Sequence, residues 1–82
     1  MTIIHRAIDK ATKKIESMGG TILAFAVEPD NINEGILYQV VAKFDTEYIV
    51  WLYNAEFNGL TSGYYIDSAR TAYEIFYKRL ER

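Results

Sequence analysis

The side chains that could support catalysis are few and lie far apart in the chain. His5 is the only histidine, and no serine or carboxylate stands at a spacing typical of a catalytic triad. Glu56 could act as a general base and Tyr64 or Tyr65 as an acid, but nearness in the sequence does not establish a catalytic pair. The sequence therefore predicts no catalytic residue, and we expect a protein that is not an enzyme.

Metal and cofactor sites are not indicated either. The chain has no cysteine, which excludes disulfides and thiolate metal sites and favours a reducing cytoplasm. The acidic loop over residues 28–35 lacks the alternating oxygen ligands and the central glycine of a calcium-binding EF-hand loop. We therefore expect no metal ion and no cofactor.

Aromatic side chains are concentrated in one stretch of the chain. Residues 48–65 contain half of all its aromatic residues. Large amphipathic rings dominate the energetics of protein–protein interfaces, so this stretch favours a binding function. The candidate protein-binding residues are Trp51, Tyr53, Phe57, Tyr64 and Tyr65.

Charge is unevenly distributed, although the net charge is only −2. Residues 1–20 and 68–82 are mildly basic, whereas residues 21–67 are acidic and contain Lys43 as their only basic residue. Carboxylates on the predicted loops and turns could imitate a row of phosphates and engage a basic partner. The candidate charge complements are Glu28, Asp30, Glu34, Asp45 and Glu47.

A basic face on the first predicted helix offers an alternative function. Four residues recur there at helical spacing on the side away from the apolar residues, namely Arg6, Lys10, Lys13 and Lys14. Such a face could contact the phosphates of a nucleic acid. Lysines on the polar face of an amphipathic helix are, however, the usual solvated surface, and Asp9 and Glu16 dilute the positive charge. Nucleic acid is therefore the less favoured partner.

Amphipathic helices are predicted at both ends of the chain. Thr2 is the predicted N-cap of the first helix, and the glycines at 19 and 20 end it. Its predicted apolar stripe consists of Ile4, Ile8, Ala11, Ile15 and Met18. Asp67 is the predicted cap of the second helix, whose stripe consists of Ala69, Ala72, Tyr73, Phe76 and Leu80.

Three strands are predicted between the helices, over residues 21–27, 36–44 and 47–54. Asp45 and Thr46 form a tight turn that joins the last two strands into a hairpin. Residues 55–63 are predicted to be a loop, because glycines interrupt them. The order α-β-β-β-α predicts a single α+β domain over residues 1–82.

This order predicts a two-layer sandwich, in which both helices cover one face of a three-stranded antiparallel sheet. The other face of such a sheet should be polar, but these strands are apolar on both sides. If the helices cover Val40, Ala42, Val50 and Leu52, the exposed face carries Val41, Ile49, Trp51, Tyr53 and either Leu23 or Phe25. Monomers seldom expose so much apolar surface. A lid formed by residues 57–65, a homodimer, or a docking face for another protein would each explain it.

Residues 51–79 contain a further pattern. A strand with tryptophan and asparagine leads through a glycine turn to a Gly-Tyr-Tyr run, and a helix with Ala72, Phe76 and Arg79 follows. The pattern resembles small proteins encoded by bacteriophages and other mobile elements. This resemblance implies an accessory protein of the host cytoplasm that binds and blocks a bacterial defence system, such as a restriction or CRISPR complex. It assigns no role to individual residues.

The compartment follows from what the sequence lacks. No apolar run approaches the roughly 18–20 residues that span a bilayer, and no signal-peptide pattern is present. We expect a soluble cytoplasmic protein without a membrane partner. The sequence favours a small protein-interaction module that forms a homodimer and binds and modulates another protein; nucleic-acid binding by the first helix is the alternative.

Overall fold

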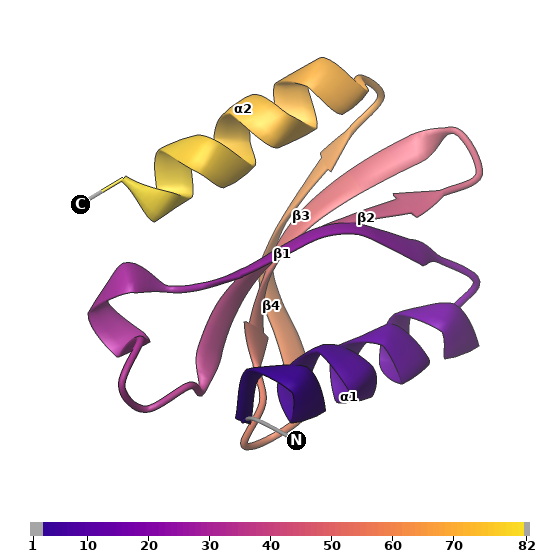
Figure 1. Cartoon of the computed structure of the whole chain (residues 1–82). Helices are drawn as coiled ribbons and strands as arrows, with labels where there is room; N and C mark the ends of the chain where they lie inside the picture. Colours follow the sequence, from indigo (N-terminus) through magenta and orange to yellow (C-terminus); the bar gives the residue numbers. More distant parts are fainter. Residues whose placement is uncertain (1–2, 82) are drawn as a thin grey trace.

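The computed structural model describes residues 3–81 as two helices and a four-stranded sheet (Figure 1). The helices are α1 (Ile3–Ser17) and α2 (Ala69–Leu80), and the strands are β1 (Thr21–Val27), β2 (Leu37–Phe44), β3 (Glu47–Asn54) and β4 (Gly59–Ile66). A short 3-10 helix, η1 (Pro29–Asn31), lies between β1 and β2. The predicted α+β class is confirmed. Neither described helix is long and apolar enough to cross a membrane.

Helix α1 ends at the two predicted glycines. Gly19 has a φ of 93°, which favours glycine, and the Gly20 N–H donates to the Ile15 carbonyl at 2.9 Å. A Cβ at Gly20 would lie 2.4 Å from the ring of Phe44, so a larger residue there would displace that ring. The N-cap predicted at Thr2 lies outside the described residues.

The four strands form an antiparallel meander in the order β1-β2-β3-β4. The predicted loop over residues 55–63 is wrong, because the chain reverses within residues 55–58 and continues as β4. Asn54 Oδ1 accepts hydrogen bonds from the N–H groups of Glu56 and Phe57 at 2.9 and 3.2 Å, and Asn58 has a φ of 52°. This tight turn brings β4 back against β3, so the sheet has four strands rather than three.

The β2–β3 hairpin contains the predicted two-residue turn. Asp45 has a φ of 51°, a conformation that aspartate tolerates better than most residues. Val40 pairs with Trp51 across the two strands. Because paired residues point to the same face of a sheet, the prediction that Val40 and Val50 share a face is wrong.

The two helices lie on opposite faces of the sheet, which gives three layers (Figure 1). Helix α2 packs over β2, β3 and β4, whereas α1 packs against β1 on the other face. The predicted two-layer arrangement is therefore wrong. Since each apolar face has its own helix, neither a lid nor a dimer is needed to explain the apolar residues on both sides of the strands.

The face under α1 holds the larger part of the core. Its buried members are Ala7, Ala11, Ile15, Tyr38, Val40, Ala42, Ile49, Trp51 and Tyr53. Aromatic rings interlock there: the Phe25 ring stacks on Tyr38 at 4.7 Å between centroids, and the Phe44 ring meets Trp51 edge-on at 5.7 Å.

The apolar stripe of α1 is rotated from its prediction. Ala7, Ala11 and Ile15 are buried, whereas Ile4 and Met18 are exposed. Small residues at positions 7 and 11 let the helix backbone approach the sheet closely. The stripe therefore follows a spacing of four residues rather than the predicted alternation of four and three.

The face under α2 holds a smaller cluster of Val41, Val50, Ala72 and Phe76. Half-buried side chains of Ile66, Ile75 and Leu80 pack around it. The helix begins one residue later than predicted, because Ser68 rather than Asp67 is the N-cap: its side chain accepts a hydrogen bond from the Thr71 N–H at 3.3 Å.

Candidate functional site

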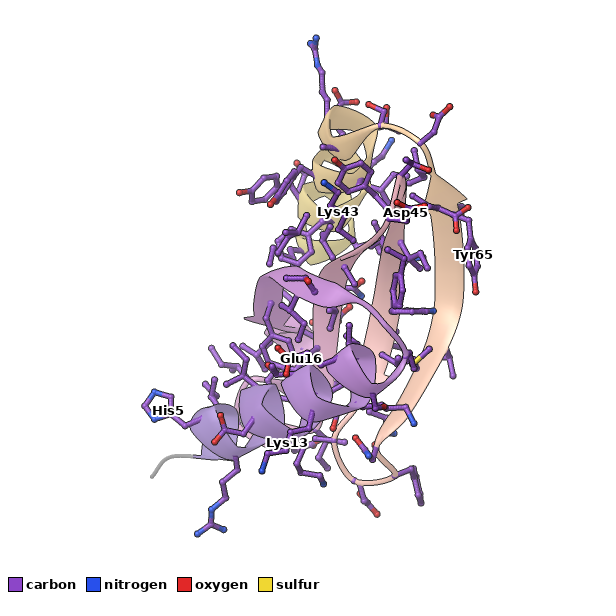
Figure 2. The ribbon with its side chains drawn as sticks, turned by 90° about the vertical axis from the view of Figure 1, so that its right-hand side faces the viewer. His5, Lys13, Glu16, Lys43, Asp45 and Tyr65 are labelled. Carbon is purple, nitrogen blue, oxygen red and sulfur yellow. The ribbon has the colours of Figure 1, made fainter. Side chains whose placement is uncertain are left out.

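The outer edge of β4 is the most exposed part of the sheet. Strand β4 pairs only with β3, so its outer side has no neighbouring strand within the described residues. Tyr64 and Tyr65 are 54% and 63% exposed. Tyr64 pairs with Val50, which belongs to the face under α2, and Tyr65 pairs with Ile49 on the face under α1. Figure 2 shows Tyr65 directed outward from β4.

A β-bulge divides this edge. The pairing between β3 and β4 shifts register opposite Trp51, and Ser62 has a φ of 55°. At Gly63 a Cβ would lie 2.8 Å from Nε1 of Trp51, so only glycine fits against the indole without displacing it. Beyond the bulge, residues 64–66 pair with β3 in regular register, and this end of the strand carries both exposed tyrosines.

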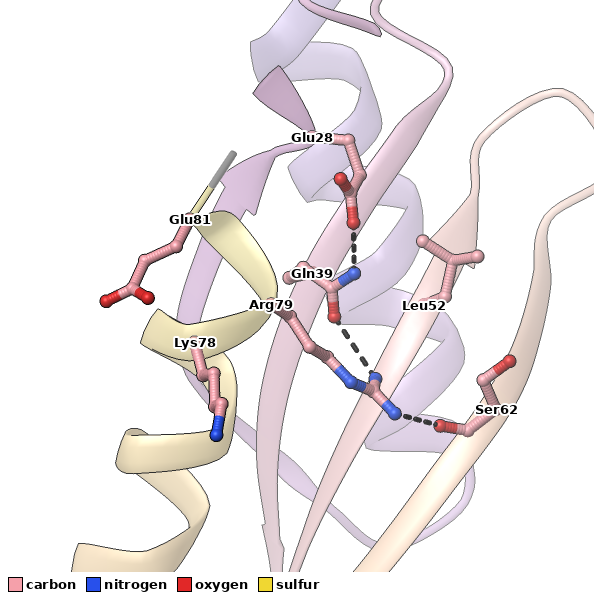
Figure 3. A pocket seen from close by; sticks show the side chains of 7 residues that line it. All are labelled: Glu28, Gln39, Leu52, Ser62, Lys78, Arg79 and Glu81. Atoms are coloured by element: carbon pink, nitrogen blue, oxygen red, sulfur yellow. Dashed lines mark hydrogen bonds between the residues drawn. The ribbon is translucent and has the colours of Figure 1, made fainter. Parts of the chain in front are cut away.

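A chain of hydrogen bonds anchors the bulge to α2 (Figure 3). Arg79 donates from Nη2 to the Ser62 carbonyl at 2.7 Å and from Nη1 to Gln39 Oε1 at 3.1 Å. Gln39 Nε2 donates in turn to Glu28 Oε1. Glu28, directly after β1, and Gln39 are only 5% and 4% exposed, so this polar chain begins in the buried face of the sheet and ends at the exposed β4. The Gln39 amide nitrogen thus donates to a carboxylate, and the Gln39 amide oxygen accepts from a guanidinium.

Two hollows flank Arg79, and the arginine lines both. One, of about 360 Å³, is also lined by Glu28, Gln39, Leu52, Ser62, Lys78 and Glu81. The other, of about 340 Å³, is lined by Tyr64, Ile75, Lys78 and Arg79 and adjoins the exposed edge. The Arg79 guanidinium lies 4.8 Å from the centroid of the Tyr64 ring, which holds this ring beside α2.

Replacement of Arg79 by leucine is expected to lower the free energy of unfolding by about 1–3 kcal/mol, because buried Gln39 Oε1 and the Ser62 carbonyl then lose their donor. Urea unfolding followed by circular dichroism measures this loss. Lys78→Leu is the matched control, since the Lys78 side chain is exposed and makes no hydrogen bond or ion pair with residues 3–81. Equal stability of the two variants would mean that the Arg79 contacts do not stabilise the fold.

The structure separates the five predicted aromatic contact residues into two groups. Trp51 and Tyr53 are buried, at 6% and 0% exposure, and so form no exposed surface. Phe57 is 77% exposed at the β3–β4 turn, and Tyr64 and Tyr65 are exposed on β4. Only the last three are placed to contact a partner.

Burial also sets the ionisation of two tyrosines in the core. The pKa of Tyr38 is raised by desolvation, and the pKa of Tyr53 is raised by desolvation and by the nearby Tyr38. Both hydroxyls therefore remain protonated and act as donors: Tyr38 to the Gly35 carbonyl at 2.7 Å, and Tyr53 to Asn58 Oδ1 at 2.6 Å. The Tyr53 bond fixes the turn that leads into β4.

The predicted acidic residues do not form one row. Glu28 is buried and holds Gln39. Asp30 and Glu34 are exposed on the connection between β1 and β2, whereas Asp45 and Glu47 are exposed at the β2–β3 turn, at the opposite end of the strands. Imitation of a continuous phosphate row by these five carboxylates therefore has no geometric basis.

The basic residues of α1 are only partly available. Arg6 and Lys13 are exposed, and Lys14 is half-buried. Lys10 is exposed, but its Nζ donates to the Ala55 carbonyl at 2.6 Å and so ties α1 to the β3–β4 turn. Figure 2 shows Lys13 on the outer side of the helix.

Sequence reasoning missed Gln39, Ser62, Ile75, Lys78 and Arg79 as residues of this region. Gln39 gave the one available signal, because it is a polar residue between Tyr38 and Val40 near the start of the strand. Arg79 was noted only as part of the pattern over residues 51–79, which assigns no role to it. Its contacts with positions 39 and 62 have no local signature.

No group of three or more histidine, aspartate or glutamate side chains is close enough to hold a metal ion within the described part of the chain. No protein-family model, curated protein or solved structure matches this chain. Function is therefore inferred from the geometry of its own residues.

Proposed function

We propose that this chain is a binding module that accepts an extended segment of another protein along the outer edge of β4. The observation that carries the proposal is the unpaired edge at residues 63–66, flanked by two exposed tyrosines on opposite faces. An edge strand offers backbone donors and acceptors at a regular spacing, which an added strand can satisfy.

The hollow beside the edge would supply specificity. In strand addition, backbone hydrogen bonds provide affinity and pockets beside the edge select alternate side chains. The hollow lined by Tyr64, Ile75, Lys78 and Arg79 offers an apolar wall next to two positive charges. It suits a partner residue with an aliphatic stem and a carboxylate, such as glutamate.

A heterologous segment fits this edge better than a second copy of β4. The bulge at Ser62 and Gly63 interrupts the strand, and Arg79 already occupies the Ser62 carbonyl. Bulges of this kind hinder the continuous pairing of two long edges. Pairing of two β4 edges in the predicted homodimer is therefore less favoured than binding of a segment from another protein. Light scattering of the isolated protein shows whether it is a dimer or a monomer.

Selection of linear peptides from a random display library against the immobilised protein tests the proposal. We expect peptides with an acidic residue to be enriched, and the Tyr64→Ala/Tyr65→Ala double variant to bind them at least about tenfold more weakly, as for hot-spot aromatic residues. Both rings are more than half exposed, and the Arg79–Tyr64 cation–π contact is worth about 0.5–1 kcal/mol, so the variant should unfold within about 8 °C of the parent.

The matched control is Tyr77→Ala, which removes a tyrosine of similar exposure, 61%, from α2. This variant should bind the selected peptides as the parent does. The proposal would be overturned if the selected peptides had the same affinity for the double variant as for the parent protein.

Nucleic-acid binding by α1 remains the rival proposal, with less support. Glu34 and Glu56 share a hollow with Arg6 and Lys10, so these carboxylates would repel a phosphate there. Replacement of Arg6, Lys10 and Lys13 by glutamate should abolish a salt-sensitive affinity for nucleic acid but should leave peptide binding unchanged.

The biological partner is proposed from the resemblance to phage and mobile-element accessory proteins. On that basis the bound segment belongs to a bacterial restriction or CRISPR complex, whose activity the module blocks. Phage infection of a host that carries such a defence complex tests this role. The parent protein should protect the phage, and the Tyr64→Ala/Tyr65→Ala variant should not.

A further inference from the structure

A third hollow is lined by the β1–β2 connection, the β3–β4 turn and the first half of α1. Figure 1 shows where these segments lie in the fold. The volume of the hollow is about 350 Å³. Ligand pockets span roughly 300–1,000 Å³, so this one suits a small molecule. It shares no residue with the hollows beside β4.

The lining divides into an apolar base and a charged rim. Ala7 and Gly35 are buried and Ile36 and Ala55 are half-buried, which places these four residues at the base. The exposed rim consists of two cations of α1 and two carboxylates of the loops, namely Arg6, Lys10, Glu34 and Glu56.

Hydrogen bonds hold the walls together without a ligand. The Ala55 N–H donates to the Ile36 carbonyl at 2.8 Å and joins the two loops, and Lys10 Nζ joins α1 to the Ala55 carbonyl. The buried Tyr38 hydroxyl donates to the Gly35 carbonyl at 2.7 Å and so fixes the β1–β2 connection where it lines the hollow. Such a preformed cavity loses little freedom when a ligand binds.

The rim charges do not neutralise one another. Within residues 3–81 no ion pair joins Arg6 or Lys10 to Glu34 or Glu56, although all four surround the same hollow. Lys10 uses one donor for Ala55, and an ammonium has three. The two cations lie on α1 and one carboxylate lies on each loop, where Glu34 Oε2 also accepts a hydrogen bond from Asn31 Nδ2 at 2.7 Å. This arrangement complements a ligand that carries both charges.

We infer that this hollow binds a free amino acid with an apolar side chain. The carboxylate of the amino acid faces Arg6 and Lys10, the ammonium faces Glu34 and Glu56, and the side chain packs on the base formed by Ala7, Ile36 and Ala55. This site is independent of strand addition at β4, since the two regions have no lining residue in common.

Titration of the 15N-labelled protein with L-leucine tests the inference, with L-valine and L-phenylalanine as further probes. Saturable shifts are expected at the amides of Ala7, Gly35, Ile36 and Ala55. Isoamylamine and 4-methylpentanoate each keep the apolar body and only one charge, so each should bind about fivefold more weakly than leucine. The Tyr64→Ala/Tyr65→Ala variant should bind leucine as the parent does, which separates this site from the proposed function.

Single variants that each remove one charge show which rim residue contacts which end of the ligand. Arg6→Gln should weaken leucine about fivefold and leave isoamylamine unchanged, whereas Glu56→Gln should weaken leucine similarly and leave 4-methylpentanoate unchanged. Lys13→Gln, an exposed lysine of α1 outside the lining, is the control and should change nothing. Absence of saturable shifts at the four amides with all three amino acids would overturn the inference. So would equal binding of leucine and 4-methylpentanoate, since the pocket would then select an anion only.

Discussion

Replacement of Trp51 by alanine is expected to lower the free energy of unfolding by about 3–5 kcal/mol, the usual loss for a large buried aromatic residue. The indole is 6% exposed, meets the Phe44 ring edge-on, and packs against the backbone at Gly63. A domain of this size is stable by only several kcal/mol, so the variant should be partly or wholly unfolded at room temperature.

Urea unfolding followed by far-ultraviolet circular dichroism measures this loss. Phe57→Ala is the matched control: this ring is 77% exposed, and its removal should change the free energy of unfolding by less than about 0.5 kcal/mol. A Trp51→Ala protein that is as stable as the parent but has lost a partner would mean that the indole lies on a docking surface, as the sequence alone suggested.

Replacement of Phe76 by alanine should cost about as much, roughly 3–5 kcal/mol, because this ring fills the cluster between α2 and the opposite face of the sheet. Phe76 is 4% exposed and packs with Val41 and Val50. The same unfolding measurement applies, with Tyr77→Ala as the control, since Tyr77 is the exposed neighbour on the same helix.

The pair of variants tests the three-layer arrangement. Trp51 and Phe76 lie in separate clusters on opposite faces of the sheet, so their losses should add. A Phe76→Ala protein with the stability of the parent would mean that α2 does not cover its face. The predicted two-layer arrangement, with both helices on one face of the sheet, would then be the better description of the fold.

Local signals in the sequence predicted much of the secondary structure. Gly19 and Gly20 end α1 as expected, because a left-handed backbone follows the helix. The Asp45–Thr46 turn was also predicted, and it fixes the register of β2 against β3. Carried one step further, that register pairs Val40 with Trp51 and would have assigned the two faces correctly.

The placement of the helices was not predictable from local signals. Strands that are apolar on both sides indicate cover on both faces, and the structure supplies it with one helix per face. The connections between α1 and β1, residues 18–20, and between β4 and α2, residues 67–68, carry no sequence signal that selects one face of the sheet. The apolar pattern was therefore interpreted as a surplus, although it was the signal for a third layer.

Strand β4 was missed for a related reason. Gly59, Ser62 and Gly63 are typical of loops, yet here the bulge uses Ser62 in a left-handed conformation and Gly63 to admit the indole of Trp51. An edge strand tolerates such residues, because only one of its sides is paired. Arg79, which anchors the bulge, lies 17 positions from Ser62 and 40 from Gln39, so no spacing rule connects them.

Amide hydrogen exchange of the protein, alone and with a selected peptide, tests the proposed binding edge most directly. In the free protein, the outward-facing amides of residues 63–66 should exchange quickly, and those of β2 and β3 slowly. Added peptide should slow exchange at residues 63–66 and leave β1 unchanged, because the new strand pairs with β4. Protection that appears at β1 or along α1, with residues 63–66 unaffected, would contradict binding at this edge.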